Sequence, residues 1–393
     1  MEKIYLDNAA TTFLADEVKS EIESKFDLFG NPSSRYSLGK EVRIEIENAR
    51  DKIANFIGAK SDEVVFTSGA TESNNFAIKG VALANPNKKQ IIVSAIEHPS
   101  ILETCNAMKK LGYKIDIIPV DKEGIIKIDE LNKKTSKDTL LVSVMHVNNE
   151  IGTIQPIEEI AKICKAKKVL FHVDAVQSFA KIPINVNSIG VDLLSVSGHK
   201  INAMKGIGFL YIKKGTKIIP LLHGGGQEEG MRSGTENVLG IISLAKAIGL
   251  KRNELEVRNC RDRIIHEILK IPGARLSGSQ SKRVYNNACF SFYGIEGESL
   301  QMLLDEEGIY VSTGSACSSN KLAGSHVLKA IGVNNYYLNG SIRVSLDSLN
   351  VLSRETEKFI IQKIKENVEK LSKISPFKFS TQGVSPAGRK EKK

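Results

Sequence analysis

The residue with the most informative chemistry is Lys200, which follows an apolar run at 191–196 and the short connection 197–199. A short apolar run bounded by glycine predicts a buried strand, so Lys200 is expected at the carboxyl end of a strand. Among small and hydroxyl side chains, a lysine can lose its proton and act as an amine nucleophile that forms a Schiff base. A solvent-exposed lysine after a strand is the commoner arrangement, so other motifs must decide between the two.

Two further segments place polar groups at expected strand ends. Residues 67–72 follow a strand at 64–66 and open a helix, where backbone N–H groups and the Thr71 hydroxyl can hold a phosphate, or where Thr71 caps the helix. Asp174 follows a strand at 169–173, and its carboxylate can pair with a protonated ring nitrogen or cap the next segment. The phosphate cradle, the acid and the lysine together predict a site for pyridoxal 5'-phosphate.

A histidine and a cysteine add groups for proton transfer and nucleophilic attack. His98 follows a strand at 90–94 and is expected in the same cleft, where it suits proton transfer; a structural histidine is the alternative. Cys317 lies in the small, polar run 313–320, which predicts a loop with an accessible thiol, although a cysteine without chemistry is compatible with it. No metal site is predicted. The other cysteines lack metal-ligand spacing and are expected to be buried and inert: Cys105, Cys164, Cys260 and Cys289.

The elements that must position these groups alternate regularly along the chain. Uniformly apolar strands separated by helices predict an α/β fold with a mostly parallel central sheet covered by helices, whose ligands gather at the carboxyl ends of the strands. Strands are expected at 64–66, 90–94, 114–120, 139–145, 169–173 and 192–196. Helices are expected at 16–26, 39–57, 72–83, 100–111, 128–133 and 156–165.

The pattern changes in the last third of the chain. One long helical stretch is expected from about 235 to 270, followed by strands at 287–292, 309–311 and 341–344 and helices at 298–306 and 354–371. This mixture predicts a smaller α+β domain. We therefore divide the chain into a large domain at 16–256, a small domain formed by 1–15 and 257–375, and a basic, disordered tail at 376–393.

Composition restricts the function classes. The 393 residues carry a net charge of +10, and no apolar run is long enough to span a membrane. The first residues include an acid where a signal peptide would need an apolar stretch, which predicts a cytoplasmic protein. Without a nucleic-acid motif, direct nucleic-acid binding is not expected, whereas anionic ligands or an acidic protein partner fit the charge.

The motifs together resemble the group I cysteine desulfurases of the iron–sulfur-cluster and nitrogen-fixation type, which are class V aminotransferase-like enzymes of the pyridoxal-phosphate transferase fold type I. The resemblance departs from the family pattern at 201–205, after the lysine, and at 320–325, after the cysteine. The segments that carry it are 5–12, 67–75, 145–152, 197–200, 232–235, 314–317 and 341–346.

The resemblance implies roles in binding the cofactor. Lys200 would carry pyridoxal 5'-phosphate as an aldimine and shuttle protons, and Asp174 would pair with the ring nitrogen. His98 would stack on the ring and take part in catalysis. The other implied cofactor contacts are Gln177 at the phenolic oxygen, Asn149, the phosphate-binding residues Ala70, Thr71, Ser197 and His199, and Thr235 from the partner subunit of a homodimer.

The resemblance also implies the reaction. Asn149 and Arg343 would bind L-cysteine, with Arg343 taking its carboxylate through two parallel hydrogen bonds. Cys317 would attack the substrate sulfur, giving L-alanine and a persulfide that passes to an iron–sulfur scaffold protein or to tRNA thiolation; it would also help to ligate a nascent cluster shared with the scaffold. Selenocysteine lyase, aminotransferase and non-catalytic scaffold functions are the alternatives.

Overall fold

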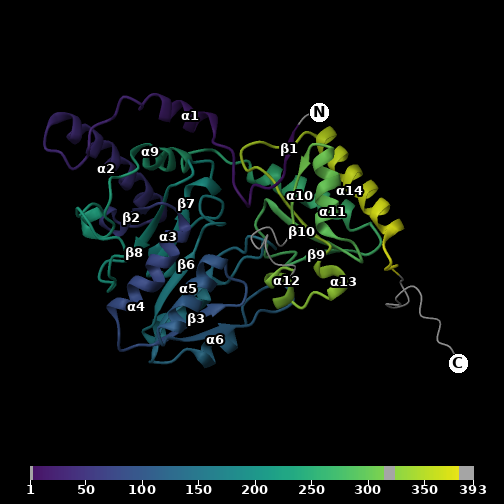
Figure 1. Ribbon diagram of the computed structural model, residues 1–393, viewed down its shortest axis with the longest axis horizontal. Coiled ribbons are helices and arrows are strands. Elements are labelled where there is room, and N and C mark those ends of the chain that lie inside the picture. The colour runs from purple at the N-terminus through teal and green to yellow at the C-terminus, as the bar shows by residue number, and fades with distance from the viewer. Residues whose placement is uncertain (1–2, 314–323, 380–393) are drawn as a thin grey trace.

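The computed structural model describes residues 3–313 and 324–379, and its elements gather around a larger and a smaller sheet (Figure 1), beside a two-stranded pair described below. Within these residues the larger sheet has seven strands in the order β2-β8-β7-β6-β5-β3-β4. Strands β4, β3, β5, β6 and β7 pair in parallel, whereas β8 runs antiparallel to both β7 and β2. The strand bounds are β2 (Val64–Thr67), β3 (Gln90–Ser94), β4 (Lys114–Ile118), β5 (Thr139–Met145), β6 (Leu170–Asp174), β7 (Leu193–Ser197) and β8 (Gly208–Ile212).

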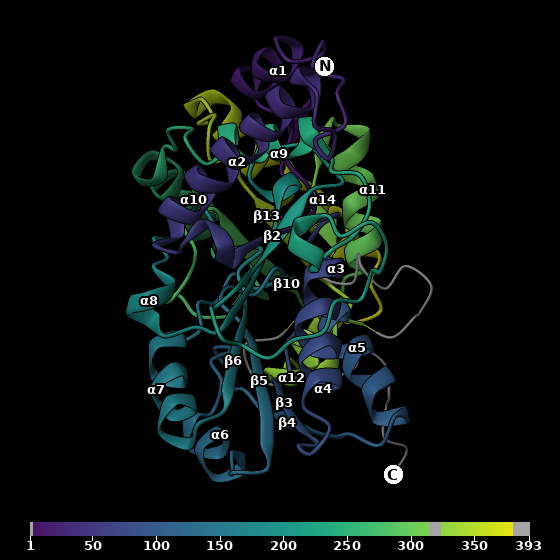
Figure 2. The ribbon, with the colours of Figure 1, turned by 90° about the vertical axis from the view of Figure 1, so that its left-hand side faces the viewer.

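Helices cover both faces of this sheet, as Figure 2 shows with α6 and α7 on one side and α4 and α5 on the other. Because side chains alternate along a strand, Leu194 of β7 packs in one core and its neighbour Leu193 in the other. The first core also holds α1 (Asp16–Glu23), α2 (Ser37–Ile57), α6 (Ile128–Lys134), α7 (Ile157–Lys167), α8 (Val186–Ile189) and α9 (Val238–Ala247). The second holds α4 (Val81–Ala84) and α5 (Pro99–Lys110).

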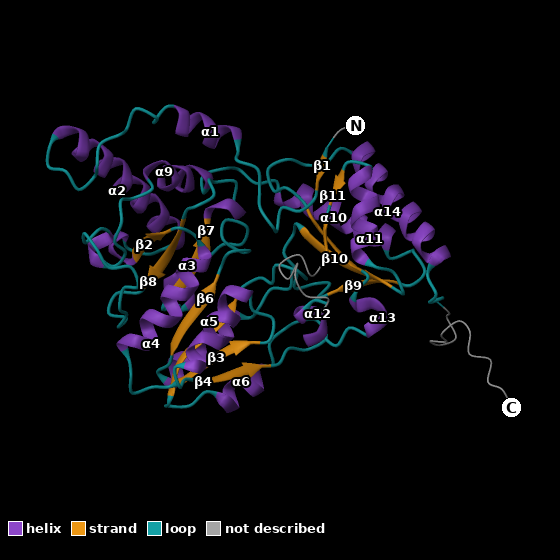
Figure 3. Ribbon diagram, viewed as in Figure 1, coloured by secondary structure: helices purple, strands orange, loops and turns teal. Residues whose placement is uncertain are grey.

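The second sheet is antiparallel, with the order β12-β13-β10-β9, and lies under three helices (Figure 3). Its strands are β9 (Ala274–Ser277), β10 (Asn287–Phe292), β12 (Ser312–Thr313) and β13 (Ser341–Ser345), and its helices are α10 (Glu254–Ile268), α11 (Gly297–Glu306) and α14 (Arg354–Ile374). The N-terminal β1 (Ile4–Tyr5) pairs with β11 (Ile309–Tyr310) and adds Ile4 and Leu6 to this core. This supports placing residues 1–15 in the smaller domain, although the domain boundaries stay a prediction.

The predicted alternation and the mostly parallel sheet are confirmed, but several elements differ from the prediction. Strand β8, strand β9 and the short helices α12 (His326–Ala330) and α13 (Asn335–Leu338) were missed. The helix expected at 72–83 is interrupted: α3 (Ala70–Asn75) is followed by a π-helical turn at 76–80 and then by α4. The stretch expected from 235 to 270 is two helices, α9 and α10.

The break between α9 and α10 has a physical cause in Arg252. Its guanidinium donates hydrogen bonds to the carbonyl oxygens of Ala247 and Leu250, which satisfies groups that the end of α9 leaves without helical partners. The side chain of Asn253 then donates to the carbonyl of Leu349, 2.6 Å away, and ties the connection to the smaller sheet.

The first residues after α14 pack against the smaller domain. Phe377 packs edge-on against Tyr336, with 5.3 Å between ring centroids, and Phe379 lies 5.7 Å from Tyr293. Residues 380–393, which make up most of the predicted tail, lie outside the described residues. No helix in the described part of the chain is both long enough and apolar enough to cross a bilayer.

Candidate active site

A cavity of about 570 Å³ opens where the parallel strands end. The ends of β6 and β7 contribute Asp174 and Ser197, the turn after β3 contributes His98, and Arg343 enters from the smaller sheet. The N-terminal segment at 9–11 closes another side. The cavity therefore lies at the carboxyl edge of the sheet, as the sequence predicts for a ligand site.

Lys200 lies within this cavity, at the end of a single 3₁₀ turn that follows β7. Its Nζ atom donates hydrogen bonds to the carbonyl oxygens of Ala9, at 2.6 Å, and Ala10, at 2.5 Å. These two carbonyls hold the amine inside the site, close to Asp174 and Gln177, which line the same cavity. The position excludes the alternative of a lysine extended into bulk solvent.

Asp174 is a buried carboxylate whose hydrogen-bond partners are neutral. Its side chain is 4% exposed, and it accepts from Asn74 Nδ2 at 3.0 Å and from the backbone N–H of Val176 at 3.0 Å. In the described part of the chain it forms no ion pair with a lysine, arginine or histidine. A buried negative charge without a cation is costly, so this carboxylate is suited to a positively charged ligand group.

His98 is connected to Asp174 through a short polar network. Its Nδ1 atom lies 2.9 Å from Ser100 Oγ, which also accepts from Asn74 Nδ2 at 2.9 Å. Burial lowers the pKa of His98, and the positive charges of Lys200 and His326 act in the same direction, whereas Asp174 opposes them. A neutral imidazole at this place can lie against a ring and can accept a proton.

The sequence prediction missed Asn74, which organises this network. A signal was available, since Asn74 follows Thr71 by three residues and therefore shares its helix face.

The segment predicted to hold a phosphate lies beside the cavity, at the start of α3. Gly69 has φ 146°, a conformation that favours glycine, and a Cβ atom at Gly208 would lie 2.8 Å from the Cα atom of Gly69. The first N–H groups of a helix have no partners within it, so they can face an anion. Ala70, Thr71, Ser197 and His199 all line the cavity beside them.

His199 enters this cradle as a neutral donor. Its Nδ1 atom lies 3.1 Å from Thr11 Oγ1. Burial, together with the charge of Lys200, lowers the pKa of His199 to about 4. A neutral ring that accepts from Thr11 at Nδ1 carries its proton on Nε2 and can donate it to an anion.

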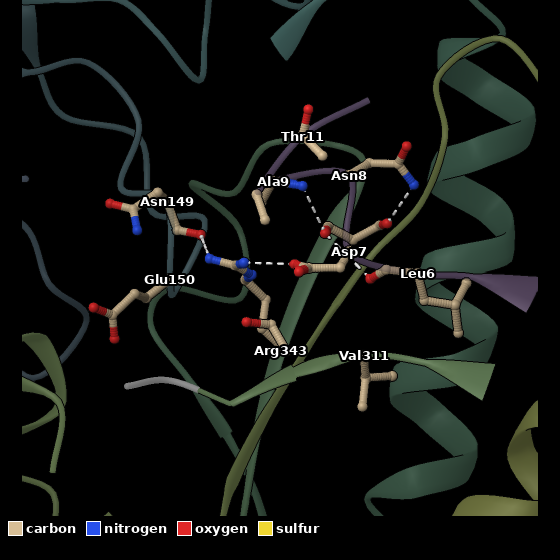
Figure 4. A network of polar contacts seen from close by, with 12 residues as sticks. Leu6, Asp7, Asn8, Ala9, Thr11, Asn149, Glu150, Val311 and Arg343 are labelled. Atoms are coloured by element: carbon tan, nitrogen blue, oxygen red, sulfur yellow. Dashed lines mark hydrogen bonds and ion pairs between the residues drawn. The ribbon is translucent and has the colours of Figure 1, made fainter. Parts of the chain in front are cut away.

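Arg343 and Asn149 lie together on the side of the cavity nearer the smaller sheet (Figure 4). Arg343 Nη2 donates to Asp7 Oδ1 at 2.6 Å, and Nη1 donates to the carbonyl oxygen of Asn149 at 2.8 Å. The Nε atom is buried without a hydrogen-bond partner in the described part of the chain. Asp7 and the Asn149 carbonyl thus hold the guanidinium in place at the cavity wall.

Two predicted site residues are not brought to this cavity. Thr235 is exposed and does not line it, so within one chain it makes no contact with the phosphate cradle. Cys317 lies outside the described residues. The described residues on either side of it are β12 (Ser312–Thr313) before and the segment from residue 324 after. In that second segment, the Nε2 atom of His326 lies 3.0 Å from the carbonyl oxygen of Glu97.

Two buried acids near the site were also missed. Glu97 is 0% exposed, accepts from Ser94 and from the N–H of Met145, and has its pKa raised to about 8, chiefly by burial and also by the charge of Asp174. Burial also raises the pKa of Glu150 to about 7, although Arg343 and a hydrogen bond from Ser325 oppose the shift. Both were missed because burial, which sets their protonation, is decided by tertiary packing.

The remaining cysteines behave as predicted. Cys105, Cys164, Cys260 and Cys289 are buried and free, and burial raises the pKa of each thiol to about 12. Thiols with such pKa values are unreactive near neutral pH. No cluster that could hold a metal ion occurs among the residues that the structure describes.

Comparisons with known proteins agree with this geometry. The family model of the class V aminotransferases matches residues 4–353. The chain is 51% identical over 384 residues to a cysteine desulfurase IscS of Dictyoglomus turgidum, covering 96% of this chain and 97% of that one. It is 48% identical over 380 residues to the IscS of Methanosarcina thermophila, covering 95% and 94%.

Solved structures give the same result. A NifS-like protein superimposes with a TM-score of 0.88 at 40% identity, covering 94% of this chain and all of that one. A structure described as SspA in complex with cysteine has a TM-score of 0.81 at 34% identity, covering 89% and 100%. The chain therefore belongs to the class V aminotransferases and, within them, to the cysteine desulfurase family, which confirms the predicted resemblance and fold type.

Proposed function

We propose that this protein is a pyridoxal-phosphate-dependent L-cysteine desulfurase that converts L-cysteine and the thiol of Cys317 into L-alanine and a Cys317 persulfide. The observation that carries the proposal is the convergence of Lys200, Asp174 and Arg343 on one cavity at the strand ends. One strand-end amine, one uncompensated acid and one guanidinium are the groups that a cofactor-bound amino acid requires. The family relationship supports sulfur removal as the reaction.

The residues present fit pyridoxal 5'-phosphate. Asp174 has only neutral partners and offers its charge to a protonated ring nitrogen. Gly69, in a conformation that only glycine adopts readily, lets the chain turn so that the start of α3 lies at the cavity, where an anion would bind. When bound, this cofactor supplies an electron sink for bond breaking in the substrate.

The residues of this chain then have separate tasks around the ring. Lys200 holds the cofactor covalently and, once released, moves protons at its Nζ atom. Asp174 would pair with the ring nitrogen, and His98 would stack on the ring and take part in proton transfer. Gln177 donates to the phenolic oxygen. The proposed phosphate ligands are Ala70, Thr71, Ser197 and His199.

Arg343 and Asn149 bind the amino acid substrate. The Arg343 guanidinium, which lines the cavity and is held by Asp7 and the Asn149 carbonyl, would take the substrate carboxylate. The Asn149 side chain contacts the cofactor and the substrate.

We further propose a homodimer in which Thr235 reaches the phosphate of the partner subunit. The exposed position of Thr235 supports this arrangement, as do large apolar side chains exposed near α1 and α2. Phe29 is 78% exposed and Tyr36 is 58% exposed. Gel filtration with light scattering measures this, and a monomer carrying full activity would contradict it.

The sulfur acceptor completes the proposal. The Cys317 persulfide passes to an iron–sulfur scaffold protein or to tRNA thiolation, and Cys317 also helps to ligate a nascent cluster. We place this activity in the cytoplasm, where free, buried cysteines such as Cys105 and Cys289 are usual.

The experiment measures L-alanine and sulfide formed from L-cysteine by the purified protein and by Cys317→Ser, with a thiol reductant present to release the persulfide sulfur as sulfide. The variant should lose both products and keep the visible absorbance of the cofactor on Lys200. Cys260→Ala, which removes a buried thiol of the smaller core, is the matched control and should keep the activity. Full activity in Cys317→Ser would refute the persulfide step, and glutamate formed from 2-oxoglutarate would indicate an aminotransferase instead.

A further inference from the structure

A second buried lysine, Lys181, lies behind the cavity and has no task in the proposed reaction. Its side chain is 7% exposed, and it follows Gln177 by four residues in the turn after β6. Its Nζ atom donates to the Gln177 carbonyl oxygen at 3.3 Å and to Gln177 Oε1 at 3.5 Å. A buried ammonium is costly, so its retention beside a residue of the cavity wall calls for a function.

The contacts of Gln177 give the carboxamide one orientation. Gln177 Nε2 donates to the carbonyl oxygen of Ala9 at 2.9 Å, and the same oxygen accepts from Lys200 Nζ at 2.6 Å. A carbonyl oxygen can only accept and an ammonium can only donate. If the amide turned over, oxygen would face Ala9 and N–H groups would face Lys181. Lys181 and Ala9 together therefore direct Nε2, with its second hydrogen, to the cavity side.

The charge of Lys181 acts on Lys200 as well. Burial lowers the pKa of Lys181 to about 7, and the positive charges of Lys200 and Arg252 act in the same direction. Among the described residues, the carboxylates that face it are Glu158 and Glu254, across an adjoining pocket, and neither forms an ion pair with it. Because electrostatic coupling is reciprocal, a proton on Lys181 makes a proton on Lys200 less favourable.

We propose that Lys181 is a positioning residue of this site: its Nζ donor fixes the Gln177 carboxamide with Nε2 toward the cavity, and its protonated form favours the neutral amine of Lys200. The action of Gln177 on the ring oxygen rests on the proposed function. The effect on the Lys200 amine does not, since both lysines are present without any cofactor.

The first experiment measures the pKa of the Lys200 amine in the full-length, cofactor-free protein. The rate of acetylation by acetic anhydride is followed against pH by mass spectrometry of the Lys200 peptide. Lys181→Met should raise this pKa by about half a unit or more, because a neighbouring positive charge is lost. In Lys181→Arg the pKa of the Lys200 amine should stay near the wild-type value. The same holds for Lys162→Met, which removes an exposed lysine of α7. An unchanged pKa in Lys181→Met would overturn the charge effect.

The second experiment is a double-mutant cycle on the cofactor-loaded enzyme, with the visible absorbance titrated against pH. Lys181→Met and Gln177→Leu should each raise the apparent pKa, because a donor at the ring oxygen favours the deprotonated form. In the double variant the shift should be smaller than the sum, since Lys181 acts partly through Gln177. Additive shifts would overturn the positioning role.

As a control for folding, the thermal unfolding of each variant is measured. A merely structural role would lower the unfolding temperature without moving either pKa, and that outcome would also overturn the proposal. Should Lys181→Met fail to fold, Lys181→Gln serves instead, because it keeps a donor and loses the charge; the acetylation pKa should then still rise. Failure of the wild-type protein to bind pyridoxal phosphate would count against the proposed function and leave the acetylation test decisive for Lys181.

Discussion

Asp174 and Arg343 are buried charges in the same cavity, but their neighbours differ. Arg343 is already paired with Asp7 at 2.6 Å, and the carbonyl of Asn149 holds it from another side. Asp174 has only the neutral donors Asn74 and Val176. A compensated charge can be preorganised at little cost and bind a ligand weakly and reversibly, whereas an uncompensated one favours a permanent cationic partner. This difference supports the proposal that Asp174 serves a resident cofactor and that Arg343 serves a substrate that binds and leaves.

The largest expected effect on activity comes from Lys200, because both the proposed cofactor site at Asp174 and the proposed substrate site at Arg343 depend on it. Lys200→Ala removes the covalent attachment and the proton carrier, so alanine formation should fall by about 10³-fold or more. Lys205→Ala is the control, because Lys205 also lines the cavity. It has no assigned role and should change the rate little. Rates are measured as alanine formed per enzyme, and comparable losses in both variants would refute the assignment of Lys200.

The next effect tests the cofactor end. Asp174→Asn keeps the side-chain shape and removes the charge, so we expect kcat to fall by about 10²-fold or more and cofactor binding to weaken. The dissociation constant is measured by equilibrium dialysis against pyridoxal phosphate. A variant that bound the cofactor as tightly as the wild type would show that the uncompensated acid does not serve a cationic ring.

A smaller effect is expected at the substrate end, on KM more than on kcat. Arg343→Lys replaces a planar fork by a point charge and should raise KM for L-cysteine about 10-fold or more. Asp7→Asn loosens the guanidinium and should raise KM less, by several-fold, with the cofactor absorbance unchanged. Steady-state kinetics distinguish the two ends, and a fall in kcat with unchanged KM in Arg343→Lys would contradict the comparison.

The two ends also differ in how far the sequence could predict them. Asp174, Ser197 and Lys200 follow local apolar runs, so strand periodicity alone places them at one sheet edge. The partners of Arg343 could not be predicted in this way, because Asp7 lies 336 residues away along the chain. Contacts of this kind depend on how two sheets meet.

The misses in the fold have similar causes. Strand β8 could have been found, since residues 207–212 are apolar and follow Gly206. Helices α12 and α13 have five and four residues, too few for a periodic pattern to show.

The smallest expected effect compares Asp174 with Glu97, a second buried acid with neutral donors. The pKa of Glu97 is raised to about 8 in the folded protein, against about 4.3 in an unfolded chain. Between these values the folded state binds the extra proton, so the free energy of unfolding falls as pH rises, by up to about 1.4 kcal/mol per pH unit from this group. Glu97→Gln removes this contribution and should flatten the pH dependence between pH 5 and 8, about the window set by these pKa values.

Urea unfolding of the wild type and Glu97→Gln at several pH values measures the difference. Parallel pH profiles would show that Glu97 is ionised in the folded protein. Because the charge of Asp174 contributes to the raised pKa of Glu97, the flattening caused by Glu97→Gln should shrink in an Asp174→Asn background. That coupling would show that Asp174 carries its charge in the cofactor-free protein, as its role toward a cationic ring requires. If Glu97→Gln flattened the pH dependence equally in both backgrounds, Asp174 would not be the charge that raises the pKa of Glu97, and the contrast between Asp174 and Arg343 would fail.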